Sequence, residues 1–132
     1  MSGPVTAALG AGSGAGSGAG SNLGAKYAKF RDASHAALGE TMTAQVRRAI
    51  AQVHGLDHAP GDNGARDDPP ADAAWLAYAR RMPFEHTAIT DEEAAAVVAE
   101  LGEARYVAFS VVAALADAEC RAARVDLPGL TA

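Results

Sequence analysis

The chain has 132 residues, enough for one small domain, and carries a net charge of −5 with its acidic and basic residues mixed along its length. No Lys/Arg cluster occurs, so we expect neither nucleic acid nor a membrane as a partner. The longest apolar run, residues 107–116, is too short to span a bilayer and the start of the chain lacks a signal-peptide pattern, which indicates a cytoplasmic protein.

The N-terminal part of the sequence contains the repeated pattern GAGSGAGSGAGS at residues 10–21. Such a segment buries too little apolar surface to offset the entropy lost on ordering. We therefore predict a flexible, disordered tail or linker over residues 1–22, of natural or engineered origin, and a helical domain over residues 23–132.

Two helices are predicted in the first half of this domain. The first covers residues 23–38 and is ended by Gly39. The second covers residues 42–54, with Thr41 or Thr43 as its N-cap and Gly55 at its end. Its apolar face repeats at helical spacing and leaves Arg47 and Arg48 outside, being made of Val46, Ala49, Ile50 and Val53.

A loop rich in Pro, Gly and Asp is predicted over residues 56–70. A third helix follows over residues 71–82, because Pro83 disfavours its continuation. Its apolar side consists of Trp75, Leu76, Ala79 and Met82.

The last two helices have clear start and stop signals. Thr90 and Glu93 form a capping box that opens a helix ending near Leu101, with Gly102 as its stop. The longest helix then covers residues 103–125. Its wide apolar face contains Val107, Val111, Ala114, Leu115 and Ala118. No segment shows sustained alternation of period two, so the fold class is all-α.

The segment from Trp75 to Leu127, which begins WLAYARRM and continues through TAITDEEAAAVVAELGEARYVAF, resembles the closing half of the alkylhydroperoxidase D-like / carboxymuconolactone decarboxylase superfamily. The resemblance rests on the order of caps and apolar positions, and on Arg121 near the end of the long helix. It implies a single five-helix domain, and relatives commonly form trimers or hexamers.

The preceding stretch, LGETMTAQVRRAIAQVHGLDHA, resembles the catalytic helix of that family. Active peroxidases carry a Glu, two cysteines in a CxxC motif and a His at positions that correspond here to Gln45, Leu56, Ala59 and Asn63. Leu and Ala supply no nucleophile, and Gln takes no proton at neutral pH. CxxC peroxidase chemistry is therefore excluded, and the single cysteine of the chain excludes it independently.

Other residues offer weaker candidate sites. Cys120 is either the reactive thiol of a one-cysteine peroxidase or a buried small side chain. Glu85 and His86 in one loop, together with Asp57 and His58 in another, are the candidate acid–base residues of a non-redox lyase or isomerase.

Metal binding by His54, His58, Asp57 and Asp62 is the alternative to a solvent-facing helix end, and we predict neither a metal nor a cofactor. Aromatic side chains form either core and interface or the lining of a pocket between subunits. These are Trp75, Tyr78 and Phe84, with Tyr106 and Phe109.

The packing pattern persists while the catalytic positions are lost, which favours an oligomeric protein, a trimer or hexamer, with an interaction, assembly or regulatory role and a possible protein partner. The alternative is a carboxymuconolactone decarboxylase-like lyase or isomerase acting on a small organic acid or biosynthetic intermediate. A one-cysteine peroxidase is the third hypothesis.

Overall fold

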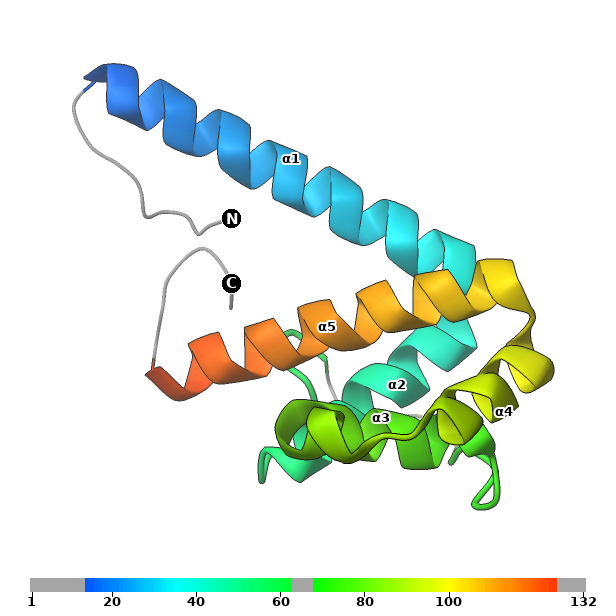
Figure 1. Ribbon diagram of the computed structural model, residues 1–132. Coiled ribbons are helices and arrows are strands. Elements are labelled where there is room, and N and C mark those ends of the chain that lie inside the picture. The colour runs from blue at the N-terminus through cyan, green and yellow to red at the C-terminus, as the bar shows by residue number, and fades with distance from the viewer. Residues whose placement is uncertain (1–13, 63–67, 126–132) are drawn as a thin grey trace. The chain divides into compact units, whose positions relative to one another are not determined.

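The computed structural model describes residues 14–62 and 68–125, and every described element is a helix, as the all-α prediction requires (Figure 1). The chain divides between Ala33 and Ser34 into two units. The described part of the first unit belongs to α1 (Gly14–Leu38). The second unit contains the end of α1 and the remaining helices, which are α2 (Glu40–Val53), α3 (Ala74–Glu85), the 3₁₀ turn η1 (His86–Ala88), α4 (Asp91–Leu101) and α5 (Glu103–Val125).

Helix α1 begins at Gly14 rather than at the predicted Leu23. The Gly/Ala/Ser pattern at residues 10–21 contains no proline, so every residue in it has the N–H that helical hydrogen bonding needs. Residues 1–13 of the predicted tail lie outside the described residues.

The junction between α1 and α2 is tighter than predicted. Gly39 has a φ of 103°, a conformation that favours glycine, and serves as the N-cap of α2. The helix therefore starts at Glu40, and neither Thr41 nor Thr43 is its cap. The hydroxyl of Thr43 instead donates to the carbonyl of His35 at 3.2 Å, which satisfies an acceptor in the last turn of α1.

Helix α3 ends three residues beyond its predicted end, at Glu85, and contains Pro83 in its last turn. A proline near a helix end removes only one backbone hydrogen bond, and Pro83 is itself buried. The capping box of α4 is confirmed, because Thr90 Oγ1 accepts from the N–H of Glu93 at 3.1 Å while the Glu93 carboxylate accepts from the N–H of Thr90 at 2.9 Å.

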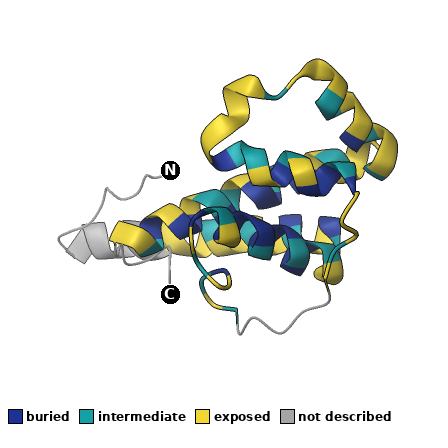
Figure 2. Cartoon of the chain, turned by 90° about the horizontal axis from the view of Figure 1, so that it is seen from below, coloured by how far each residue is buried: buried dark blue, intermediate teal, exposed yellow. Residues whose placement is uncertain are grey.

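Within the second unit, α2 packs against α3 and α5, and α4 packs against α3 and α5. Figure 2 shows buried and exposed residues alternating along the helices, as expected for helices that turn one face inward. The largest fully buried side chains are Phe109, Leu38, Ile50, Val46, Val97 and Val112.

The wide apolar face expected on α5, from Val107 to Ala118, is not the face that packs inside the domain. Val107 is 61% exposed, and Ala114 and Ala118 are exposed as well. The face that packs against α2 and α3 is the opposite one, which contains Ala108, Phe109, Val112, Ala113, Ala116 and Cys120. Because α5 is apolar on both faces, its periodicity does not select the inward one, and the bulky Phe109 takes the core position.

Candidate functional site

A buried arginine lies between α2 and α5. The Arg47 side chain, in a residue only 5% exposed, donates from Nη1 to Asp62 Oδ1 at 2.8 Å and from Nη2 to the carbonyl of Pro60 at 2.7 Å and to Glu119 Oε1 at 3.1 Å. These contacts join α2, the segment after it and α5. We call Arg47, Asp62 and Glu119 the charged cluster.

The charged cluster has a structural role, and the stability of the fold depends strongly on it. Glu119 is 3% exposed, so its carboxylate depends on Arg47 for compensation of the lost hydration. The Nε atom of Arg47 is buried and has no hydrogen-bond partner. A cluster with both charges enclosed holds two helices in register and offers no open position to a substrate.

A second polar contact connects the end of α2 to α5. His54 is 3% exposed, which corrects the solvent-facing interpretation, and its Nε2 lies 2.7 Å from Asp117 Oδ1. Arg121 Nε donates to both oxygens of Asp117 at 3.1 Å. The guanidinium of Arg121 also stacks over the ring of Phe84, with 4.9 Å between Cζ and the ring centroid, and that ring lies 5.0 Å from the imidazole.

The His54–Asp117 pair has the composition of a catalytic dyad, in which a carboxylate orients an imidazole. The Nδ1 atom of His54, however, is buried and has no partner, and the Arg124 side chain donates to the His54 carbonyl at 2.7 Å. A general base needs one ring nitrogen within reach of a substrate. The enclosed Nδ1 makes a structural contact the better interpretation of this pair.

Cys120 lies in the core, fully buried on the inner face of α5. Burial, followed by the negative charges of Glu119 and Asp117, raises the pKa of its thiol to about 11, against a smaller opposing effect of Arg47. A peroxidatic thiol needs a lowered pKa and access to peroxide. The surroundings of Cys120 provide the opposite of both requirements.

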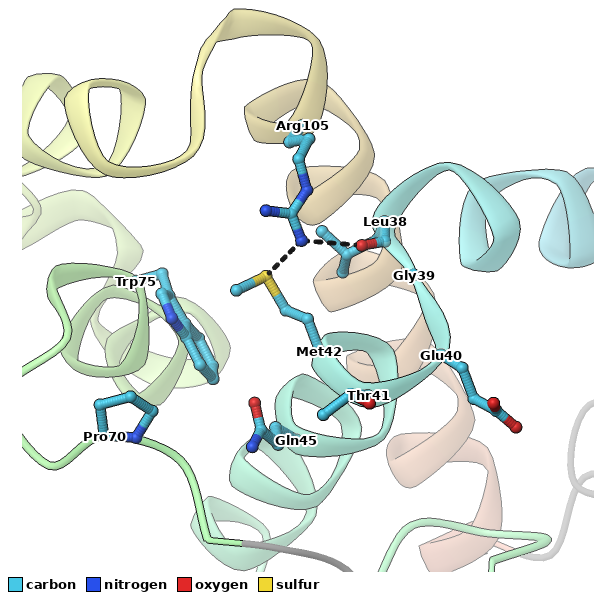
Figure 3. A pocket seen from close by; sticks show the side chains of 9 residues that line it. All are labelled: Leu38, Gly39, Glu40, Thr41, Met42, Gln45, Pro70, Trp75 and Arg105. Atoms are coloured by element: carbon cyan, nitrogen blue, oxygen red, sulfur yellow. Dashed lines mark hydrogen bonds between the residues drawn. The ribbon is translucent and has the colours of Figure 1, made fainter.

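A cavity of about 430 Å³ opens where α2 begins (Figure 3). Its walls come from the end of α1, the first turns of α2 and α5, and the start of α3. The lining residues are Leu38, Gly39, Glu40, Thr41, Met42, Gln45, Pro70, Trp75 and Arg105. The volume falls within the range of small-molecule sites, roughly 300–1,000 Å³, whereas a second cavity beside α2 has about 180 Å³.

The three aromatic residues weighed as core, interface or pocket lining differ in their surroundings. Trp75 lines the cavity, but Tyr78 and Phe84 do not. The Tyr78 hydroxyl lies 3.0 Å from that of Tyr106, and burial and this hydrogen bond raise the pKa of Tyr78 to about 12. Phe84 is 60% exposed on α3.

The predicted acid–base residues lie at two different places, each holding two neighbouring residues. Glu85 is the last residue of α3, where Arg81 Nε lies 3.8 Å from its carboxylate, and the neighbouring His86 begins η1. Asp57 and His58 follow α2. All four side chains are exposed, and none lines either cavity.

The four residues weighed as alternative metal ligands do not form a set either. His54 is bonded to Asp117 and Asp62 to Arg47, whereas the His58 Nδ1 lies 3.4 Å from the carbonyl of Ala59. Among residues 14–62 and 68–125, no group of three or more His, Cys, Asp or Glu side chains is placed to hold a metal ion.

The residues that the resemblance placed at catalytic positions differ in their surroundings. Gln45 lines both cavities, Leu56 is half-buried and Ala59 is buried in the core, whereas Asn63 lies outside the described residues. The sequence analysis did not identify Arg47 and Glu119 as a buried pair. The available signal was that each is a charged residue next to an apolar face of its helix. Arg47 lies between Val46 and Ile50, and Glu119 directly precedes Cys120 on the inner face of α5.

Comparisons with known proteins identify no relative of this chain. No protein-family model matches the chain, and no match is found among curated proteins or solved structures. None of the helices in the described ranges is long and apolar enough to cross a lipid bilayer.

Proposed function

We propose that the protein is a non-redox helical protein of the alkylhydroperoxidase D-like kind that acts through association, with a second copy of the chain bound to the outer face of α5. The observation that carries the proposal is an exposed apolar stripe on this helix. Val107 is 61% exposed and Val125 is 66% exposed, and Ala114 and Ala118 between them are exposed as well.

The spacing of this stripe suits a helical partner. Residues 104, 107, 111, 114, 118, 121 and 125 follow one another in steps of three and four, the pattern of a coiled-coil seam. All of them are Ala or Val except Arg121. Alanines permit close approach of two helices, and valines supply apolar surface to bury.

The dipole of α5 favours an antiparallel second copy. In an antiparallel pair about a two-fold axis between residues 111 and 114, Val107 faces Ala118 of the second copy. In this arrangement the two helix dipoles oppose each other favourably.

The buried Cys120 and the dispersed acid–base residues support a role that needs no chemistry at these positions. A two-fold α5 contact builds a dimer and, combined with a three-fold contact, a hexamer of the kind common among the relatives that the sequence resembles. A lyase or isomerase remains the alternative hypothesis, for which Glu85, His86, Asp57 and His58 would need a substrate brought to the surface.

The test is the solution mass of the full chain and of Val107→Glu, measured by light scattering over a concentration series. We expect an oligomer for the natural sequence and a monomer for the variant, because two buried carboxylates would face apolar surface at the contact. Ala96→Glu, on the exposed side of α4, is the matched control and should keep the natural mass. A mass equal to one chain for the natural protein, or an oligomer unaffected by Val107→Glu, would contradict the proposal.

A further inference from the structure

The cavity at the start of α2 has one cation in its wall. The Arg105 guanidinium donates from Nη2 to the carbonyl of Leu38 at 2.9 Å and contacts Met42 Sδ at 3.5 Å. Both contacts use the same nitrogen, so Nε and Nη1 make no hydrogen bond to the described residues. Arg105 is thus held in place by one nitrogen and keeps donors for a ligand.

The remaining walls of the cavity are largely apolar. Figure 3 shows the indole of Trp75 and the ring of Pro70 on one side, with the Met42 side chain between them and Arg105. The amide of Gln45 lies at the lower end. The Trp75 residue is 3% exposed, so the wall that it forms is fixed by the core behind it.

Two acidic residues near the cavity, Glu40 and Glu100, do not pair with Arg105. The Glu40 carboxylate points away from the cavity in Figure 3. Glu100, close to Trp75 in space, accepts from the backbone N–H groups of Ala74 and Trp75 at 3.0 and 2.9 Å, and so balances the start of α3. The positive charge of Arg105 is therefore available to an anionic group.

We propose that this cavity binds a small organic acid whose carboxylate pairs with Arg105 and whose apolar body packs against Trp75 and Met42. The Nη1 amino group of the guanidinium has two N–H donors that the described residues do not use, and one of them can donate to a carboxylate oxygen of the acid. A single cation suits a singly charged acid better than a phosphate dianion. The volume of about 430 Å³ accommodates a chain of several carbons or one aromatic ring.

The chain provides its own probe for the test, because Trp75 is its only tryptophan. Hexanoate and phenylacetate are titrated into the full chain, with 1-hexanol and phenylacetamide as neutral counterparts, and the Trp75 emission is recorded with excitation at the red edge of its absorption. We expect saturable changes with at least one acid and weaker binding of its neutral counterpart, by roughly tenfold to a hundredfold, because a hydrogen bond to a charged group is lost.

Arg105→Gln should weaken binding of the acid by a similar factor and leave the neutral counterpart unaffected. Arg80→Gln, which removes an exposed cation that does not line this cavity, is the matched control and should bind as the natural protein does. If Arg105→Gln does not fold, the comparison of acid with neutral counterpart on the natural chain decides the question alone. Equal binding of both would overturn the proposal, as would no saturable change with either acid at about 20 mM, where a Kd of 1 mM gives about 95% occupancy.

Discussion

Replacing Arg47 by methionine removes the cation of the charged cluster and keeps most of the apolar stem of the side chain. The change deletes contacts of 2.8, 2.7 and 3.1 Å and leaves Glu119, which is 3% exposed, as a buried carboxylate without its cation. Breaking one side of a buried ion pair costs about 3–5 kcal/mol. That is a large share of the roughly 5–15 kcal/mol that stabilise a typical domain.

The assay is urea unfolding of the full chain, followed by far-UV circular dichroism. Arg48→Met is the matched control on the same helix, because Arg48 pairs at 3.4 Å with Asp68, whose side chain is 88% exposed. Exposed pairs contribute about 0–1 kcal/mol, so the control should stay close to the natural stability.

A double variant separates the loss of the Arg47–Glu119 pair from the cost of keeping the Glu119 carboxylate buried without Arg47. Arg47→Met combined with Glu119→Met should recover most of the lost stability, because two apolar side chains of similar size replace the enclosed ion pair. If Arg47→Met and Arg48→Met lose the same free energy within about 1 kcal/mol, the charged cluster does not have the role that its burial indicates.

Three further outcomes follow from single groups. Cys120 should react slowly with a thiol reagent at pH 8 in the native protein and rapidly in urea, because its native pKa is raised to about 11; equal rates would contradict its burial. Tyr78 has a pKa raised to about 12 in the folded state, so the stability associated with its neutral form is present below about pH 10 and is lost as the pH rises through 12. A titration that follows the absorbance of the tyrosine phenols checks this pKa. If all tyrosines ionise near pH 10, the raised pKa of Tyr78 is refuted. Thr90→Ala removes the acceptor for the N–H of Glu93 and should cost about 1 kcal/mol in urea unfolding, whereas no loss would show that the capping box is energetically silent.

The sequence by itself determined where several helices begin and end. The Thr90 and Glu93 pair and Gly102 mark the ends of α4 correctly, because a capping box and a left-handed glycine act within one turn of the backbone. The start of α5 at Glu103 follows from the same local signals. The end of α3 is not predicted correctly, since the burial of Pro83 in the last turn outweighs the tendency of a proline to stop a helix.

The tertiary structure alone decided which face of each helix is buried. Helix α5 offers two apolar faces, and only the packing of Phe109 against α2 and α3 shows that Val107 lies outside. Arg47 and Glu119 are 72 positions apart in the sequence, and no local rule indicates that their side chains meet. Local hydrogen bonding sets helix ends, whereas the partners of a buried charge or an apolar face depend on elements far apart along the chain, so the exposed stripe of α5 and the cavity beside Arg105 came only from the fold.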